Sequence, residues 1–176
     1  GPPSWLAEEI SAALGEVERY PAPEASRLRA AAAERYGVDG ECVVCSNGSD
    51  ELFRALAAAT GASRVLAPGP CYASYADCRL PAETPLLDAE KGFRPDFAFL
   101  DALLKRAGPG TLLFLGSPNN PTGSFPDQEA LRDLALRNSG CWIVADEAFR
   151  DFLDDGSLAS DGPPNLAATR SLTKYW

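Results

Sequence analysis

The stretch "TLLFLGSPNNPTG", residues 111–123, combines two patterns that together decide the fold. Its first half is a continuous apolar run, which is typical of a strand buried on both faces of a sheet. Its second half is rich in Pro, Asn and Gly, which end a strand and form a tight loop. Apolar residues at helical spacing precede the run at residues 96–108 and follow it at 126–140. A buried strand between two amphipathic helices indicates a βαβ arrangement and therefore a parallel sheet.

The rest of the chain continues this alternation of strands and helices. We expect strands at residues 42–46, 64–69, 111–116, 141–149 and 165–173. We expect helices at residues 4–14, 23–37, 49–60, 72–79, 96–108 and 126–140. Ser4 is the expected capping residue of the first helix, and Gly37 is expected to end the second. The sequence therefore predicts an α/β fold, in which a mostly parallel sheet carries helices on both faces.

The composition limits the classes of partner. The net charge of −9 counts against nucleic acid and against an anionic membrane surface as general partners. No run of about 18 apolar residues is present, so we expect no membrane span. The N-terminus also lacks the pattern of a signal peptide. These absences, together with the scattered cysteines, predict a cytoplasmic protein.

Side chains that commonly hold metals are few. The chain has no histidine, which excludes His-dependent triads, His general bases and His metal ligands. Cys42 and Cys45 form a C-x-x-C pair within the expected strand at residues 42–46. Residues three apart on a strand point to opposite faces, so this pair could not hold a metal together. We therefore expect no metal site and five reduced, structural cysteines, namely Cys42, Cys45, Cys71, Cys78 and Cys141.

Conspicuous residues follow three of the expected strands. In parallel sheets, functional residues lie just past the carboxyl ends of the strands. Here "SNGSD" (46–50) opens a helix, "SPNNPTG" (117–123) follows the central apolar run, and Asp146 ends another run. Small residues at a helix N-terminus suit an anionic group, because free backbone N–H groups point at it. An ordinary turn with an N-cap serine explains 46–50 equally well, and a tight Pro/Gly loop explains 117–123, so each stretch taken singly leaves both readings open.

Taken together, these segments resemble one enzyme family. In order, the chain carries "RYPAPEASRLR" (19–29), "NGSDE" (47–51), "PGPCY" (68–72), "SPNNPTG" (117–123), "VADEAF" (144–149) and "SLTK" (171–174). This set resembles the fold-type I pyridoxal-phosphate enzymes of the aminotransferase class I/II family, and nearly the whole chain takes part. It is most similar to the branch that holds histidinol-phosphate aminotransferase and the threonine-phosphate decarboxylase of cobalamin synthesis.

The resemblance implies a site for pyridoxal 5'-phosphate. Lys174 would be catalytic and form a Schiff base with the cofactor, since the reaction needs an amine whose pKa can be lowered. Asp146 would face the pyridine nitrogen and keep it protonated. Asn120 would donate a hydrogen bond to the phenolic oxygen, and Tyr72 would lie against the face of the ring. Without the family context, Tyr72 reads as a core aromatic.

The resemblance also implies where the phosphate of the cofactor is held. Gly48, Ser49 and Asp50 would bind it through backbone N–H groups and side chains, and Ser171 would reach it from three residues before the lysine. Tyr20 matches a tyrosine that crosses to the neighbouring subunit in dimeric relatives, which implies a homodimer. Without the family context, Ser171 would simply end a strand and Tyr20 would pack beside a helix.

The chain departs from the family pattern at Phe149. Many relatives have a tyrosine three residues after the aspartate, and its hydroxyl shares the phenolic oxygen of the cofactor with the asparagine. Phe149 together with "RSLTK" (170–174) resembles the decarboxylase side of the branch, whereas "PCY" and "SPNNPTG" resemble the aminotransferase side equally well. Glu147 and Tyr75 are expected to be structural, with Tyr75 serving in packing.

We therefore expect a pyridoxal-phosphate enzyme that acts on a small molecule, an amino acid, an amine or an amino-phosphate. We favour a threonine-phosphate decarboxylase-like reaction, and the alternative is transamination like that of histidinol-phosphate aminotransferase. A third reading is a non-catalytic module with an aminotransferase-like fold. Such a module would have no chemical need for Lys174, Asp146 and Asn120 together.

The resemblance covers only the first part of the family's sequence. In relatives the chain continues past the lysine with a Gly-Leu-Arg segment, the rest of the large domain and a small C-terminal domain. We expect residues 1–176 to form the N-terminal and central part of the pyridoxal-phosphate-binding large domain. The missing part holds one arginine for the cofactor phosphate and another for the substrate carboxylate. We therefore expect the 176-residue chain alone to be inactive.

Overall fold

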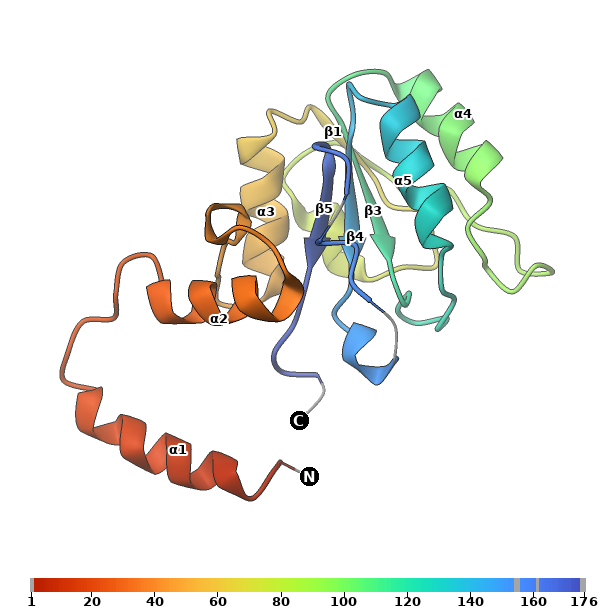
Figure 1. Cartoon of the computed structure of the whole chain (residues 1–176). Coiled ribbons are helices and arrows are strands. Elements are labelled where there is room, and N and C mark those ends of the chain that lie inside the picture. The colour runs from red at the N-terminus through yellow and green to blue at the C-terminus, as the bar shows by residue number, and fades with distance from the viewer. Residues whose placement is uncertain (1, 154–155, 161, 175–176) are drawn as a thin grey trace. The chain divides into compact units, whose positions relative to one another are not determined.

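The structure is a computed structural model that describes residues 2–153, 156–160 and 162–174. The chain forms two compact units. The larger unit contains residues 46–171, and the smaller unit contains residues 1–45 and 172–176. Figure 1 labels the main helices and the strands along the chain.

The larger unit is built around a parallel sheet. Within the described residues its strands are β1 (Arg64–Leu66), β2 (Ala82–Glu83), β3 (Thr111–Gly116), β4 (Trp142–Asp146) and β5 (Leu166–Thr169). Their order across the sheet is β2-β1-β3-β4-β5, and every neighbouring pair is parallel. The carboxyl ends of the strands therefore meet at one edge of the sheet (Figure 1). The predicted α/β fold with a mostly parallel sheet is confirmed.

Two of the helices that flank this sheet have capping residues at their ends. The flanking helices are α3 (Ser49–Ala59), η3 (Ala73–Asp77), α4 (Phe97–Ala107), α5 (Gln128–Arg137) and η4 (Arg150–Phe152), where η denotes a 3₁₀ helix. Asp96 caps α4 by accepting hydrogen bonds from two backbone N–H groups of its first turn, and Asp127 caps α5 in the same way with one. Gly108 ends α4 with a φ of 81°, which a glycine adopts without strain.

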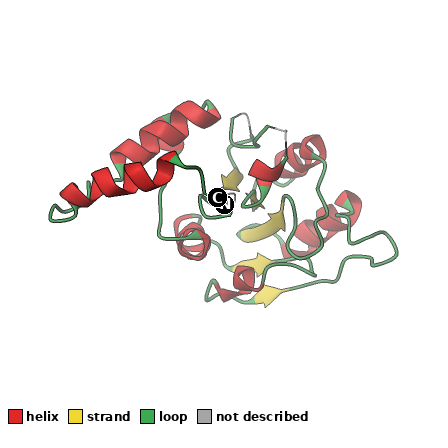
Figure 2. Ribbon diagram, turned by 90° about the horizontal axis from the view of Figure 1, so that it is seen from below, coloured by secondary structure: helices red, strands yellow, loops and turns green. Residues whose placement is uncertain are grey.

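Helices cover both faces of the sheet, as predicted. β3 is buried along its whole length, and its side chains alternate between the two faces. Leu113 and Leu115 share a core cluster with the apolar residues of α4 and α5. Leu112 and Phe114 share a second cluster with residues of α3 and η3. Figures 1 and 2 show α3 on one side of the sheet and α4 with α5 on the other.

The smaller unit consists of short helices that bury little. They are α1 (Trp5–Ala13), η1 (Leu14–Glu16), α2 (Ser26–Tyr36) and η2 (Gly40–Cys42). Gly37 ends α2, as predicted, and has a left-handed conformation with a φ of 65°. Arg29 of α2 donates to the carbonyl of Gly40 at 2.7 Å and pairs with Glu24 at 3.0 Å. Ser4 stands at the capping position of α1, as predicted, but its backbone has helical dihedral angles and its side chain makes no capping hydrogen bond.

The strand predicted at residues 42–46 is also wrong. Cys42 ends η2, and residues 43–48 form neither helix nor strand. Val44 is 71% exposed, so this short apolar run is not buried by a neighbouring strand. Cys42 and Cys45 are therefore not held on opposite faces of a strand. Nevertheless, the five cysteines are free, and no group of three or more Cys, Asp or Glu side chains in the described residues could hold a metal ion.

Two smaller differences concern the other elements. The segment predicted as a helix at 72–79 forms the 3₁₀ helix η3, and β2 was not predicted at all. A strand of two residues gives no readable periodicity, and β2 exists only because Ala82 and Glu83 pair with β1. No helix within the described part of the chain combines the length and the apolar character that crossing a bilayer requires.

Candidate active site at the carboxyl edge of the sheet

The carboxyl edge of the sheet carries several of the residues predicted for a site. The loop 117–123 follows β3, Asp146 ends β4, and Ser171 follows β5. The register pairs Gly116 with Asp146 and Asp146 with Thr169. The ends of three neighbouring strands therefore lie side by side, with Asp146 on the middle one.

Asp146 is a buried carboxylate held by hydrogen bonds. Its Oδ2 accepts from the hydroxyl of Tyr75 at 2.7 Å, and its Oδ1 accepts from Thr169 Oγ1 and from the backbone N–H of Ala148, both at 3.1 Å. Burial raises the pKa of Asp146, these three hydrogen bonds lower it, and the adjacent charge of Glu147 raises it. An ionised carboxylate offers about four acceptor positions, of which these bonds fill three. Asp146 can therefore receive one further donor.

Tyr75 is a site residue that the sequence did not reveal. It packs as predicted, because its ring stacks on Phe114 with centroids 5.0 Å apart and meets Phe53 edge-on at 5.2 Å. In addition, its hydroxyl is the donor to Asp146. Burial, followed by the charge of Asp146, raises the pKa of Tyr75 above its usual range, so the hydroxyl keeps its proton. The sequence held no signal for this role beyond the spacing Y-x-x-Y that places Tyr75 one turn after Tyr72.

Tyr72 lies beside this cluster and stays partly open. Its ring meets Tyr75 edge-on at 5.7 Å and Phe53 of α3 at 6.5 Å, and 36% of the residue is exposed. The start of α3 is tied to the same region, because Ser74 Oγ donates to Asp50 Oδ2 at 3.1 Å. The contacts thus join the beginning of α3, η3 and the end of β4 into one continuous group.

The N-terminus of α3 has the form of a small cradle. Gly48 is its capping residue, with a φ of 92°, and Ser49 is the first helical residue, so the reading of Ser49 as an N-cap is wrong. A Cβ atom at Gly48 would meet nothing within 4 Å, so the space beside the turn is open. Two side chains shape the turn: Ser46 Oγ donates to the carbonyl of Gly48, and Glu51 accepts from the backbone N–H of Asn47. Backbone N–H groups of the first helical turn give this end a positive partial charge.

The loop after β3 is held by Asn119, which the sequence reasoning did not single out. Asn119 Nδ2 donates to the carbonyl of Pro70 at 2.9 Å and to Thr122 Oγ1 at 2.8 Å, which ties the loop to the one after β1. A Cβ atom at Gly116 would come within 2.5 Å of Asn119 Cα, so the loop can fold back only over a glycine. Asn120, the predicted cofactor ligand, is exposed at the outer side of this turn.

The remaining predicted residues are divided between the two units. Ser171 is half-buried and belongs to the larger unit, directly after β5. Lys174 and Tyr20 belong to the smaller unit, and both side chains are exposed there. The larger unit therefore brings together Gly48, Ser49, Asp50, Tyr72 and Asp146 through the contacts above, while Asn120 and Ser171 follow neighbouring strands at the same edge.

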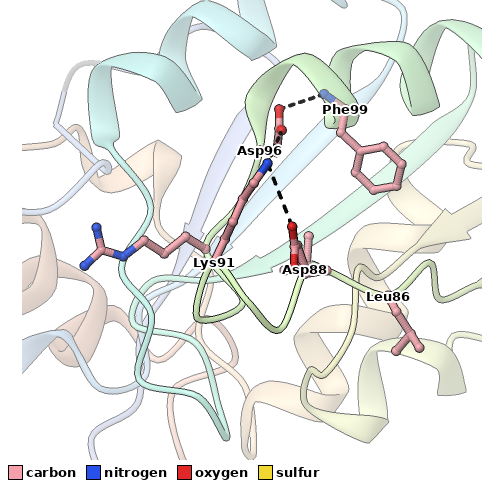
Figure 3. A pocket seen from close by; sticks show the side chains of 7 residues that line it. Leu86, Asp88, Lys91, Asp96 and Phe99 are labelled. Carbon is pink, nitrogen blue, oxygen red and sulfur yellow. Dashed lines mark hydrogen bonds and ion pairs between the residues drawn. The ribbon is translucent and has the colours of Figure 1, made fainter.

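A separate surface pocket of about 250 Å³ lies between β2 and the start of α4 (Figure 3). Its lining residues are Leu86, Leu87, Asp88, Lys91, Arg94, Asp96 and Phe99. Lys91 reaches between Asp88 and Asp96, at 3.9 and 3.8 Å, so its charge is balanced within the pocket. None of the residues predicted for the active site lines this pocket.

The whole chain, residues 1–176, matches the family described as aminotransferase class I and II. The chain belongs to this family. The predicted family is thereby confirmed, and the larger unit is the part of this aminotransferase-family chain that carries the parallel sheet.

Two curated relatives are similar to this aminotransferase-family chain along its full length. The putative threonine-phosphate decarboxylase of Caldanaerobacter subterraneus is 34% identical over 189 residues, which is 100% of this chain and 50% of the relative. The histidinol-phosphate aminotransferase of Dinoroseobacter shibae is 33% identical over 184 residues, again 100% of this chain and 50% of the relative. The chain therefore spans about half the length of the curated relatives it matches.

Solved structures confirm the fold of the aminotransferase-family chain. The crystal structure of histidinol-phosphate aminotransferase from Sinorhizobium meliloti in complex with pyridoxal-5'-phosphate superposes with a TM-score of 0.81. The comparison covers 97% of this chain and 48% of that one at 22% sequence identity. At this level of identity, the likeness establishes the shared fold.

Proposed function

We propose that the protein is a pyridoxal-phosphate-dependent enzyme that acts on an amino acid or amine, and that its reaction is like that of threonine-phosphate decarboxylase. The observation that carries the proposal is Asp146, a buried carboxylate at the carboxyl edge of the sheet that can receive one further donor. Membership in the aminotransferase family and the similarity to a putative threonine-phosphate decarboxylase support it.

The residues at the edge of the sheet fit such a cofactor. The free acceptor position of Asp146 suits the N–H of a protonated pyridine, and the partly exposed ring of Tyr72 offers a surface for its face. The open position beside Gly48, at the positive end of α3, suits a phosphate, and Ser49 and Asp50 begin that helix. Asn120 and Ser171 would complete the set as donors to the phenolic oxygen and the phosphate.

Each residue then has a defined task in the reaction. When bound, pyridoxal phosphate supplies an electron sink for a bond broken at the substrate's Cα. Asp146 would accept a hydrogen bond from the ring nitrogen, and the bonds from Tyr75 and Thr169 orient that carboxylate and lower its pKa against the effect of burial. Lys174 would hold the cofactor through its amine and, when that amine is free, would move a proton at Cα.

Phe149 stands where many relatives have a tyrosine, so of those two donors to the phenolic oxygen of the cofactor only Asn120 would remain. Its ring has no hydroxyl to donate, and it lies against Phe152 with centroids 6.5 Å apart. We keep the decarboxylase-like reaction as the main proposal on this feature. The alternative is transamination, which the similarity to histidinol-phosphate aminotransferases supports. Release of carbon dioxide from threonine phosphate, measured against formation of a keto product from histidinol phosphate, separates the two.

We also propose that the working form is a cytoplasmic homodimer in which Tyr20 reaches the cofactor phosphate of the partner subunit. The side chain of Tyr20 is fully exposed within its own unit, which supports this role. Sedimentation of the protein loaded with cofactor tests the dimer. A Tyr20→Phe variant should weaken cofactor binding without changing the mass of the assembly.

The decisive test is covalent trapping of the cofactor. The chain has three lysines, of which Lys91 and Lys105 are paired with carboxylates on the surface of the larger unit. Incubation with pyridoxal phosphate, borohydride reduction and peptide mapping by mass spectrometry should place one adduct on Lys174. Lys174→Ala should abolish the adduct, and the matched control Lys105→Ala should keep it. A wild-type protein without an adduct, or with adducts spread over all three lysines, would contradict the enzyme and favour a non-catalytic module.

A further inference from the structure

A second carboxylate, Glu147, follows Asp146 and lies on the opposite face of the sheet. Side chains alternate along a strand, so Asp146 and Thr169 share one face while Glu147 and Arg170 share the other. The ladder extends by one bond here, from the backbone N–H of Glu147 to the carbonyl of Thr169 at 2.8 Å. Leu158, which lies in the core cluster of α4 and α5, donates its backbone N–H to Glu147 Oε1 at 2.9 Å. Glu147 therefore sits on the side of the sheet away from the candidate active site.

Arg170 joins this buried carboxylate to a third segment. Its Nη1 donates to Glu147 Oε2 at 3.1 Å, and its Nη2 donates to Asp151 Oδ1 in η4 at 2.5 Å. The side chain of Glu147 is fully buried, and those of Arg170 and Asp151 are 14% and 21% exposed. The planar guanidinium thus spans two carboxylates from different segments, a geometry that a lysine cannot reproduce.

Arg170 lies close in sequence to the predicted catalytic lysine. Arg170 is the first residue after β5, and it is followed directly by Ser171. Lys174 lies four residues after Arg170. The network holds the side chain of Arg170 and therefore restrains its backbone, at the point where the chain leaves β5. The three segments that the network joins are the exits of β4 and β5 and the helix η4 between them.

We propose that Arg170 is a positioning residue for Lys174. Held between Glu147 and Asp151, it would orient the start of the segment that carries the lysine and so prepare its amine for attachment to the cofactor. Arg170 would act through the backbone, since its partner Glu147 lies on the other face of the sheet. This inference rests on the proposed function, in which Lys174 bears the cofactor.

The test separates binding of the cofactor from its attachment. Arg170→Gln removes both the positive charge and the planar guanidinium that donates to two carboxylates. Arg170→Lys keeps the positive charge but lacks the guanidinium. The control is Arg132→Gln on α5, because the Arg132 side chain is 18% exposed, close to the 14% of Arg170, and also pairs with a carboxylate, that of Glu129. For each variant we would measure the rate at which borohydride traps pyridoxal phosphate on Lys174. In parallel we would measure the affinity for pyridoxamine phosphate, which has no aldehyde and binds without attachment.

Misplacing a reacting group by a small distance slows its reaction strongly, so we expect Arg170→Gln to slow attachment by about tenfold or more. The affinity for pyridoxamine phosphate should stay within about threefold, Arg170→Lys should recover part of the rate, and Arg132→Gln should change neither quantity. If Arg170→Gln does not fold, Asp151→Asn loosens one side of the fork and should slow attachment to a smaller extent.

Three results would overturn the inference. Wild-type attachment rates in Arg170→Gln and in Asp151→Asn would show that the network does not orient the lysine. A parallel loss of pyridoxamine phosphate affinity and of thermal stability would show a purely structural role. If the wild-type protein attaches no cofactor to Lys174, the proposed function fails together with this inference. If the wild-type protein attaches it normally and Arg170→Gln attaches it at the same rate, only this inference is overturned.

Discussion

Replacement of Tyr75 by phenylalanine isolates one hydrogen bond in the candidate active site. The change removes the hydroxyl that donates to Asp146 Oδ2 at 2.7 Å and keeps the ring that stacks on Phe114. A hydrogen bond to a charged acceptor stabilises a folded protein by about 1.5–3 kcal/mol, and one between neutral groups by about 1 kcal/mol. We therefore expect Tyr75→Phe to lower the free energy of unfolding by about 2 kcal/mol when Asp146 is ionised and by about 1 kcal/mol when it is protonated.

The dependence of this effect on pH follows from the pKa of Asp146. Burial raises the folded-state pKa above the value of about 3.9 for an unfolded Asp, so the folded state binds this proton more tightly. The stability that this contributes is complete below the unfolded pKa and is lost as the pH rises through the folded pKa. Without the hydrogen bond of Tyr75, which lowers that pKa, the folded-state pKa of Asp146 rises further. The loss of stability is then larger and extends to higher pH.

Urea unfolding of the cofactor-free protein between about pH 4 and pH 8 measures this difference directly. The gap between wild type and Tyr75→Phe should widen by about 1 kcal/mol from the acidic to the basic end of this range. Tyr72→Phe is the matched control, because it removes the same atom from a neighbouring ring that is not a partner of Asp146. A stability gap that stays constant with pH, or one that narrows toward pH 8, would show that Tyr75 does not bond an ionised Asp146.

Further changes test the local geometry of the edge, and each is checked by the free energy of unfolding. Gly116→Ala places a Cβ atom 2.5 Å from Asn119 Cα and should cost about 1–3 kcal/mol, since the loop must shift; an unchanged stability would contradict the close approach. Asp127→Ala removes the cap of α5 and should cost about 1 kcal/mol, whereas Asp127→Ser should keep most of that stability. Gly48→Ala places a side chain on a residue with a φ of 92° and should cost about 1–3 kcal/mol. Gly15→Ala is the control and should not destabilise the protein, because the space there is open and φ is not positive. Equal effects at both glycines would count against strain at Gly48.

Several strands and helices could be predicted from the local sequence, because each of them has one clear pattern of residues. β3 and β4 are continuous apolar runs, and both strands formed where those runs lie. α4 and α5 combined helical spacing with an aspartate at the capping position. The run at residues 42–46 looked similar, but four apolar residues do not distinguish a strand from an exposed loop, and Val44 lies open to solvent.

The candidate site also contains residues that could be predicted from the sequence and residues that could not. Asp146 was predictable, because a carboxylate that directly follows an apolar run must lie at the rim of the sheet. The donor that holds it, Tyr75, is 71 residues away in sequence, and nothing near either residue indicates the pairing. Asn119 was hidden for a related reason, since its partner Pro70 is 49 residues away. The roles assigned to Lys174, Asn120 and Tyr20 stay predictions.

The family, the polar residues at the strand ends and the alternation of buried strands with helices could be predicted from the sequence, because each of them depends on neighbouring residues. Only the tertiary structure decided the strand order β2-β1-β3-β4-β5, the existence of β2 and the two polar networks on opposite faces of β4. Parallel strands pair across long connections, so their neighbours are selected by packing of the whole unit. The same packing brings Tyr75 to Asp146 on one face and Arg170 to Glu147 on the other.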